Sequence, residues 1–425
     1  MLDIKFIRDN AKAVKENIKK KNQNEKVKLV DELLILEKKF EKLQHNSQVI
    51  RTKRNTMNQE INKLKKEGKD IKKQIKEAQK IPKDLEKNDK EKNEIFLKMR
   101  EILLTIPNMM HKSVPLGKDE KENVVREKIG KPKKFNFKVV NHSELLEKLD
   151  LVDFDAARKV AGNGFFYLKG DLVKLNQALI QFGIDIMVEK GFTLVEPPLM
   201  INKEAANGVV DFEFFKEMIY KIEGEDLHLI ATSEHPLIAM FIGKQIDAEK
   251  LPIKIVGVSQ CFRKEIGSHG IDEKGLFRTH QFNKVEQIVI CKPEDSYTHY
   301  DEMLNISKEI FKRLEIPTRV LECCSGDLAD LKTKSADLEA YSPRKDLYFE
   351  ICSVSNLTDA QSRRLNIRVR KGNEKYFAHT LNNTAIATSR AMVAILENFQ
   401  TKEGTVKIPK ALHKYMNGVT ELKKR

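Results

Sequence analysis

The sequence predicts an α+β protein in which a long N-terminal antiparallel helical hairpin, a coiled coil, precedes a larger domain of mixed helices and strands. Three observations carry this prediction: a heptad stripe near the N-terminus, a stretch rich in proline and glycine after it, and alternating helical and strand-like patterns beyond that stretch. We expect a helical arm over residues 1–108, a linker over 109–160 and the larger domain over 161–425.

The heptad stripe is the strongest periodic signal in the chain. Ten positions are spaced alternately by three and four, and eight of them are apolar: Leu33, Leu36, Phe40, Leu43, Ser47, Ile50, Arg54, Met57, Ile61 and Leu64. A helix of about 35 residues would extend roughly 50 Å. A second, weaker apolar series follows Gly68, and Pro82 should kink or split it. We therefore expect a hairpin with its turn near residues 67–69.

The basic charge of the chain is concentrated in this arm. Residues 1–100 hold 29 Lys and Arg against 17 Asp and Glu, and residues 51–80, close to the expected turn, hold 11 against 4. Such a surface suits phosphate-rich polymers. A solvated helix face explains many charge runs equally well, so the charge alone leaves both interpretations open.

The rest of the chain has the pattern of a globular domain. Proline and glycine punctuate residues 106–140. A helical pattern over 172–189 then alternates with strand-like runs at 253–258, 287–290, 318–321 and 347–351. Neither a GxxxxGK[ST] loop nor a GxGxxG unit occurs, so a nucleotide would have to bind without the usual glycine loops.

Composition excludes several other classes of protein. No apolar run approaches the ~18 residues of a membrane span, and the N-terminus lacks the apolar core of a signal peptide. The five cysteines form no CxxC pair, which argues against a disulfide framework or a zinc ribbon. We therefore expect a cytoplasmic protein without a membrane partner.

One charged segment has the composition of a binding site. Cys261-Phe262-Arg263-Lys264-Glu265 is followed by a glycine-bearing loop and then by residues 277–286. A hairpin here places Arg263 and Glu286 on neighbouring strands. The arginine fork suits a phosphate, a carboxylate suits the ammonium of an amino acid, and Phe282 can stack on a flat base. His269, within the loop, is interpreted as solvated or RNA-facing rather than as a metal ligand.

Several segments together resemble a known family. Phe262-Arg263-x-Glu265 with Arg278-x-His280-Gln281-Phe282-x-Lys284-x-Glu286 resembles motif 2 of class II aminoacyl-tRNA synthetases. Residues 191–198 resemble motif 1, and residues 384–399, with Arg390, resemble motif 3. The turn Thr232-Ser233-Glu234 and the segment 350–364 are similar to the seryl form, as is the basic hairpin.

The resemblance implies a fold and a set of site residues. The larger domain would be a catalytic domain built on an antiparallel sheet flanked by helices. Serine would be bound by Thr232, Ser233, Glu234, Glu286 and Thr384. ATP would be bound by Arg263, Lys264, Glu265, Thr279, Phe282, Glu350, Ile351, Cys352, Ser353 and Arg390. Glu350 and Ser353 would hold Mg²⁺, and Arg263, Glu265 and Arg390 would be the catalytic residues.

The same resemblance implies the reaction and the partners. L-serine would react with ATP to give seryl-adenylate, and the seryl group would then pass to the 3′ end of serine tRNA; the resemblance also allows selenocysteine tRNA as an acceptor, which the sequence does not decide. Motif 1 implies a homodimer. Two alternatives remain at this point: an amino acid ligase acting on a carrier protein, and a catalytically weak paralogue acting as a coiled-coil RNA-binding protein.

Two places depart from the usual pattern of the family. Asn383-Thr384-Ala385 stands where glycines commonly flank the serine or threonine, and glycine allows a close backbone approach to a ligand. Cys352 and Val354 replace residues that are commonly serine and cysteine. We expect a site whose local fit is altered rather than one that is inactive.

Overall fold

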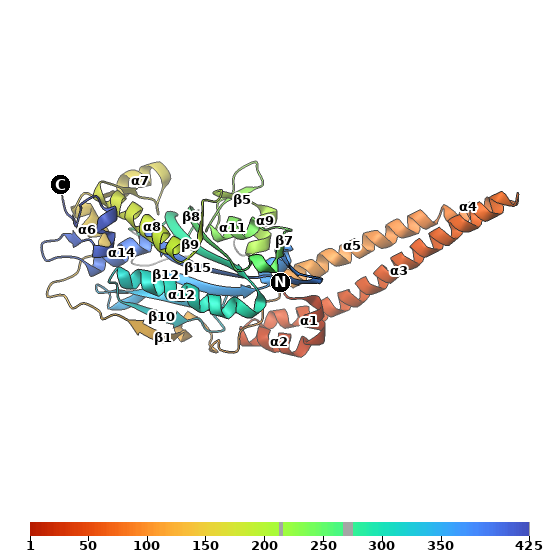
Figure 1. Ribbon diagram of the computed structural model, residues 1–425, viewed down its shortest axis with the longest axis horizontal. Helices are drawn as coiled ribbons and strands as arrows, with labels where there is room; N and C mark the ends of the chain where they lie inside the picture. The colour runs from red at the N-terminus through yellow and green to blue at the C-terminus, as the bar shows by residue number, and fades with distance from the viewer. Residues whose placement is uncertain (212–215, 267–274, 425) are drawn as a thin grey trace. The chain divides into compact units, whose positions relative to one another are not determined.

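The computed structural model describes residues 1–211, 216–266 and 275–424 (Figure 1). His269, predicted to face solvent or RNA, lies outside these residues. The chain divides into two compact units, Leu2–Pro107 and Asn108–Arg425, and Met1 belongs to the second. Among the described residues, no helix is both long enough and apolar enough to cross a membrane.

The first unit is the helical arm. Two short helices, α1 (Ile4–Asp9) and α2 (Ala11–Lys20), precede α3 (Val27–Lys66), α4 (Lys72–Ala78) and α5 (Ile81–Thr105). Figure 1 shows α3 and α5 side by side over most of their length. The chain reverses at Gly68, whose φ of +68° favours glycine. Pro82 lies in the first turn of α5, so the second helix is split there. The predicted hairpin is confirmed.

The predicted stripe forms the seam between α3 and α5. Leu33, Ser47 and Met57 are buried, and the Phe40 and Phe96 rings lie 6.1 Å apart. Arg54, the other polar position of the stripe, is exposed. Residues early in α3 pack against residues late in α5, as in an antiparallel coiled coil, and Phe40 with Phe96 is one such pair.

The second unit is built on an eight-stranded sheet, in the order β1-β10-β11-β12-β15-β9-β8-β4. Its strands are β1 (Val124–Ile129), β4 (Thr193–Val195), β8 (Ile253–Phe262), β9 (Gln281–Cys291), β10 (Thr318–Glu322), β11 (Lys334–Ser342), β12 (Leu347–Thr358) and β15 (His379–Ala387). Every neighbouring pair is antiparallel except β4 and β8. The predicted antiparallel sheet is therefore confirmed, and all four strand-like runs lie in it.

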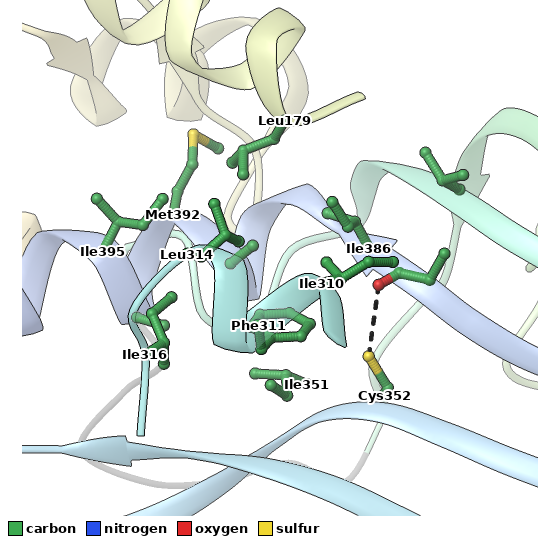
Figure 2. Close-up of a cluster of buried hydrophobic side chains, with 14 of the residues drawn as sticks. Leu179, Ile310, Phe311, Leu314, Ile316, Ile351, Cys352, Ile386, Met392 and Ile395 are labelled. Carbon is green, nitrogen blue, oxygen red and sulfur yellow. Dashed lines mark hydrogen bonds between the residues drawn. The ribbon is translucent and has the colours of Figure 1, made fainter. Parts of the chain in front are cut away.

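Three long helices pack on this sheet: α8 (Asp171–Glu189), α12 (Ser296–Arg313) and α14 (Thr388–Asn398). Figure 2 shows the apolar side chains that join them to the strands, with Phe311 of α12 beside Ile351 of β12 and Met392 of α14 near Leu179 of α8. Burial of such side chains supplies most of the driving force for this packing, at roughly 25 cal/mol per Å² of apolar surface.

Smaller elements complete the second unit. They are α6 (His142–Lys148), β2 (Val152–Asp153), α7 (Phe154–Ala161), β3 (Tyr167–Leu168), β5 (Met200–Asn202), α9 (Lys203–Val209), β6 (Leu227–Leu229), α11 (Glu234–Ala239), β7 (Gln245–Asp247), α13 (Ala360–Leu365), β13 (Arg368–Lys371), β14 (Glu374–Phe377), β16 (Val406–Lys407) and β17 (Glu421–Leu422). The segment 109–160 contributes the edge strand β1 and the helix α6 to this unit.

The alternation of side chains along β9 separates core from site. Val285 and Gln287 point to the face that the helices cover: Gln287 donates a hydrogen bond to Ser307 of α12 at 3.0 Å, and a Cβ added at Gly183 of α8 would lie 3.4 Å from Val285. Lys284 and Glu286 therefore point to the opposite face. Polar residues on that face surround a pocket.

Candidate active site

The pocket lies over the middle of the sheet and opens to solvent, and it holds about 510 Å³ of empty space when its open mouth is included. Strands β9, β12 and β15, the helix α14, and the segments directly after β8 and before β9 supply its walls. The residues that line it are Arg263, Glu265, Phe277, Arg278, Thr279, Phe282, Lys284, Glu350, Ile351, Thr384, Ala387, Ser389 and Arg390. Cationic, anionic and aromatic groups thus meet in one cavity, which suits a charged ligand with a flat ring.

One end of the pocket holds a buried ion pair. Lys284 Nζ lies 2.6 Å from Glu286 Oε2, and both side chains are almost fully buried. Thr384 Oγ1 donates to the same carboxylate oxygen at 3.3 Å, because β15 pairs with β9 at this register. A buried carboxylate with a cation and a hydroxyl beside it is prepared for a small ligand that carries both an ammonium and a hydroxyl group.

The turn before α11 reaches this end from another part of the chain. A Cβ added at Gly257, which pairs with Glu286 across the sheet, would lie 2.8 Å from Ser233 Oγ and 2.4 Å from Leu237 Cδ1. A side chain at position 257 would therefore force Ser233 and Leu237 to shift, whereas glycine leaves the turn close to β8. Ser233 Oγ is buried and has no hydrogen-bond partner within the described part of the chain.

Glu234 follows this turn as the first residue of α11, and its carboxyl is partly protonated near pH 7. Thr232 Oγ1 accepts a hydrogen bond from the Glu234 backbone N–H at 3.2 Å, and Gln361 donates to Glu234 Oε1 at 2.9 Å. Burial, together with the nearby Glu286 charge, raises the pKa of Glu234 to about 7. Burial next to Lys284 and Arg263 lowers the pKa of His235 to about 3, so this imidazole is neutral at pH 7.

The other end of the pocket carries two arginines. Arg263 follows β8, and its Nε donates to the Ala231 carbonyl at 3.2 Å while its guanidinium lies 5.3 Å from the Phe282 ring centre. The backbone then turns at Glu265, whose φ of +47° is uncommon for a residue with a side chain.

Arg390 and Glu350 form the second charged pair. Arg390 Nη1 lies 3.0 Å from Glu350 Oε2 and 2.8 Å from the Glu350 carbonyl, and its guanidinium lies 5.5 Å from the Phe277 ring centre. Desolvation opposes ionisation of Glu350, but the Arg390 charge and hydrogen bond, helped by Arg263, hold the pKa of this carboxyl below its ordinary value. Two cationic forks and two aromatic rings now surround the space where a nucleoside phosphate would fit.

Comparison with known proteins identifies the family. The seryl-tRNA synthetase N-terminal domain matches residues 1–110, and the class II tRNA synthetase core domain for glycine, histidine, proline, serine and threonine matches residues 215–399. The serine–tRNA ligase of Methanospirillum hungatei is 50% identical over 327 residues, which are 76% of this chain and 77% of that protein. The chain belongs to the seryl-tRNA synthetase family.

Solved structures of the family agree over the whole length. The seryl-tRNA synthetase of Pyrococcus horikoshii, solved with ATP, is 42% identical, with a TM-score of 0.94 and full coverage of both chains. The cytoplasmic serine–tRNA ligase of Naegleria fowleri, solved with AMP, is 33% identical, with a TM-score of 0.88 and coverage of 100% of this chain and 99% of that chain. Both share the helical arm and the class II core.

Most residues predicted for the synthetase site lie together. Those lining the pocket are Arg263, Glu265, Thr279, Phe282, Glu350, Ile351, Thr384 and Arg390. Glu286 lies directly behind them, bonded to Thr384, and the Thr232-Ser233-Glu234 turn adjoins it.

Besides Glu286 and the Thr232-Ser233-Glu234 turn, three predicted residues lie outside the lining of the pocket. Lys264 turns away, and its Nζ lies 5.8 Å from the Tyr220 ring centre. Cys352 points into the core, where its Sγ lies 3.7 Å from the Ala385 carbonyl (Figure 2). Ser353 pairs with Asp337 on β11 and hydrogen-bonds its carboxyl. The roles assigned to these three residues stay predictions, as do those of the residues that line the pocket.

The oxygen donors around Glu350 fit a magnesium ion. The Glu350 carboxylate and the Ser353 hydroxyl come from one strand, and Asp337 adds a second carboxyl beside them. Among the described residues, no group of three or more His, Cys, Asp and Glu side chains could hold a metal. This arrangement suits Mg²⁺, which binds through one or two carboxylates together with substrate phosphates and water.

Sequence reasoning assigned no role to several pocket residues. Lys284 belongs to motif 2 without an assigned role. Because it lies two residues before Glu286 on β9, it points to the same face and lies beside that carboxylate in the pocket. Phe277 lies under Arg390. Asp337 and Gln361 lie behind the pocket rather than in its lining: Asp337 belongs to no motif of the sequence, and Gln361 belongs to the segment 350–364 without an assigned role.

Proposed function

We propose that this serine–tRNA ligase activates L-serine with ATP in the pocket described above and then transfers the seryl group to the 3′ end of serine tRNA. The observation that carries the proposal is the placement of Lys284, Glu286 and Thr384 at one end of a pocket whose other end holds Arg263 and Arg390. The family identity and the two charged ends of this pocket both support it.

Serine would bind at the carboxylate end. Glu286 and Glu234 would offer acceptors for the ammonium and hydroxyl groups; Thr384 lines the pocket beside Glu286, and Thr232 precedes Glu234 in the adjoining turn. A site that hydrogen-bonds the hydroxyl rejects alanine, because its own polar groups would be left unpaired. The buried position of Glu286 strengthens this selection, since a low dielectric strengthens each electrostatic contact.

ATP would bind at the arginine end. Phe282 would stack on adenine, and the Arg263 fork would clamp the α-phosphate. Arg390 would exchange its bond to Glu350 for a bond to the γ-phosphate, which frees the Glu350 carboxylate. Glu350 and Ser353 would hold Mg²⁺, which supplies charge neutralisation between the phosphates when it is bound.

The reaction needs positioning more than proton transfer. The serine carboxylate arrives already charged and attacks the α-phosphorus, and pyrophosphate leaves. Arg263 would stabilise the charge that develops on the α-phosphate. The pocket would also hold the serine carboxylate next to the α-phosphorus, which lowers the entropic cost of bringing the two together. The neutral His235 is buried beside the turn and is not required as a base in this step. A terminal ribose hydroxyl of tRNA then attacks the adenylate carbonyl.

Serine-dependent exchange of pyrophosphate into ATP tests the proposal directly. With magnesium present, purified protein should catalyse the exchange. Arg263→Ala should reduce it by on the order of 1,000-fold, because one transition-state donor of this kind contributes 10²–10³ in rate. Arg313→Ala, which removes an arginine of a surface ion pair on α12, is the matched control and should leave the exchange unchanged. Absence of exchange in the wild type would favour an inactive RNA-binding paralogue instead.

The domain assignments follow from the same proposal. Residues 1–108 would be the tRNA-binding arm, 109–160 the connection and 161–425 the catalytic domain. The basic residues near the hairpin turn support the first assignment, since the segment 51–80, with 11 Lys and Arg against 4 Asp and Glu, attracts a phosphate backbone. Charging assays with serine tRNA and with selenocysteine tRNA decide which acceptors the arm admits.

We also propose a homodimer that functions in the cytoplasm. Large apolar side chains are exposed around β4 and β5, near motif 1: Val188, Leu194, Leu199 and Met200. β4 is the last strand of the sheet, so this edge is open to a second subunit. The five cysteines are free and buried, which suits a reducing compartment. Light scattering of the purified protein gives the oligomeric state.

A further inference from the structure

We infer that Gln361 is a positioning residue for amino-acid binding, and that its buried amide holds the Glu234 carboxylate in the orientation that receives serine. The inference rests on the proposed function, because it assigns Glu234 to the serine end of the pocket. Gln361 does not line the pocket, so it acts through Glu234 alone.

Every hydrogen-bonding group of the Gln361 amide has a partner. Nε2 donates to Glu234 Oε1 at 2.9 Å and to the Val209 carbonyl at 2.9 Å, and Oε1 accepts from Thr380 Oγ1 at 2.6 Å. The side chain is fully buried. An amide carries two N–H donors and one carbonyl, so these bonds use both donors and the carbonyl oxygen.

Chemistry determines which way this amide faces. In the flipped orientation its oxygen would face the Val209 carbonyl and the Glu234 carboxylate, both of which are acceptors. The observed orientation is therefore the one that directs an N–H at Glu234. Three elements hold the amide there: α9 through Val209, β15 through Thr380 and α13 through the backbone of Gln361 itself.

The hydrogen bond from Gln361 affects both which Glu234 oxygen is available to serine and how readily the carboxyl ionises. Gln361 occupies Oε1, so Oε2 is the oxygen that can meet the serine hydroxyl or ammonium. A donor also favours the ionised carboxyl, as do Lys284 and Lys332, against the opposing effects of burial and of Glu286. The neighbouring His235 is neutral and leaves this balance unchanged.

Steady-state pyrophosphate exchange on Gln361→Met tests the inference, because methionine keeps the shape and removes the donor. A hydrogen bond to a charged group accounts for a change of about tenfold to a hundredfold, so the KM for serine should rise by that factor. The KM for ATP should stay within about twofold, since the arginine end of the pocket is untouched. The value of kcat/KM for serine should rise with pH as Glu234 ionises, and in this variant the rise should occur at higher pH, because Glu234 has lost a donor that favours its ionised form.

Two further variants distinguish positioning from a structural role. On a Glu234→Ala background, Gln361→Met should add no further loss of serine affinity, because the carboxylate that it serves is absent. Thr380→Val keeps Gln361 but removes the hydroxyl that orients it, and should raise the KM for serine to a smaller degree. Thr380→Val decides the question if Gln361→Met fails to fold.

Gln400→Met is the matched control. The Gln400 amide is also buried, and it bonds both backbone groups of Val140 away from the pocket. It should leave both KM values unchanged. The inference would be overturned if Gln361→Met raised the KM for serine and the KM for ATP equally, or if it left the pH dependence of kcat/KM unchanged. It would also be overturned if its loss of serine affinity added to that of Glu234→Ala. If wild-type protein shows no serine-dependent exchange, the proposed function fails first, and calorimetry with ATP alone still reports whether the fold is intact.

Discussion

The serine end of the pocket places two carboxyl groups close to one lysine. Glu286 takes Lys284 as a direct partner at 2.6 Å, whereas Glu234 feels the same lysine at longer range and has Gln361 as its hydrogen-bond donor. The two carboxyls are therefore not equivalent. Glu286 has the nearby cation and hydroxyl, while Glu234 has a raised pKa and is the group that changes charge near neutral pH.

This difference predicts a pH dependence that belongs to Glu234. Its folded-state pKa of about 7 lies above the ordinary value of 4.5, so kcat/KM for serine should rise with pH through about 7 as the carboxylate forms. Glu234→Gln should flatten that limb and lower serine affinity. The pH profile of pyrophosphate exchange at subsaturating serine measures both effects.

The same raised pKa predicts the opposite trend for stability. Between pH 4.5 and 7 the folded state keeps a proton that the unfolded chain loses, so the contribution of Glu234 is greatest below pH 4.5 and is lost as pH rises to 7. Glu234→Gln should therefore gain stability relative to wild type over this window, by at most ~3 kcal/mol. Urea unfolding at pH 5 and pH 8 compares the two. A constant difference would show that the carboxyl titrates normally.

Site residues that a sequence motif carries lie together in the structure, and their roles stay predictions. Arg263, Phe282, Glu350, Thr384 and Arg390 were predicted and line one pocket. Gln361 was recognised only as part of a motif, because its role depends on Val209, Glu234 and Thr380, which lie far from it in the chain. Such a role is visible only after folding brings the partners together.

At the scale of elements, the hairpin contains a polar layer in an otherwise apolar seam. Asn88 Nδ2 donates to Ser47 Oγ at 2.7 Å and to the Leu43 carbonyl at 3.0 Å, and Ser47 in turn donates to Asp89 at 2.8 Å. Lys92 pairs with Asp89 at 2.7 Å. A polar layer of this kind favours one register of two long helices over its alternatives.

Replacement of Asn88 tests the polar layer. Asn88→Ala should destabilise the hairpin by about 1–3 kcal/mol, because Ser47 is left buried without its donor. Hydrogen exchange of peptides from α3 and α5 measures the effect on the arm alone. Asn55→Ala, at an exposed position of α3, is the control and should change little. The double replacement Ser47→Ala with Asn88→Leu should restore stability, since an apolar pair fills the same seam. Continued loss in the double variant would contradict this account.

The class II sheet shows why the pocket has its position. Period-two alternation along β9 directs Val285 and Gln287 to the helices and Lys284 and Glu286 to the pocket. Gly257 on the neighbouring strand admits the turn that carries Ser233 and Glu234. A shift of β9 by one residue would exchange core and site, so packing of the core also determines the geometry of the site.

For the whole molecule, the division into two units predicts separable activities. Deletion of residues 31–105 should leave serine-dependent pyrophosphate exchange nearly intact, because every residue of the pocket belongs to the second unit. Charging of serine tRNA should fall by on the order of 100-fold or more, since the arm supplies the basic surface. Retained charging after the deletion would refute the role proposed for the arm.

A milder change keeps the arm and removes only its charge. Lys63, Lys65 and Lys66 lie in the last turn of α3. Replacing all three with Gln should weaken tRNA binding and reduce the slope of log K against log salt by about 2–3, if each lysine contacts one phosphate. An unchanged slope would locate the phosphate contacts elsewhere on the arm.

The sequence by itself determined the helical arm, its seam, the strands of the larger domain and the motif residues of the family, because each of these is written in local periodicity or in short fixed spacings. The tertiary structure alone decided which of those residues share a pocket, that Lys284 pairs with Glu286, and that Gln361 holds Glu234. Some of these contacts join segments more than 100 residues apart, such as Glu234 and Gln361, and all of them depend on strand register and helix packing. Local sequence patterns do not encode this geometry.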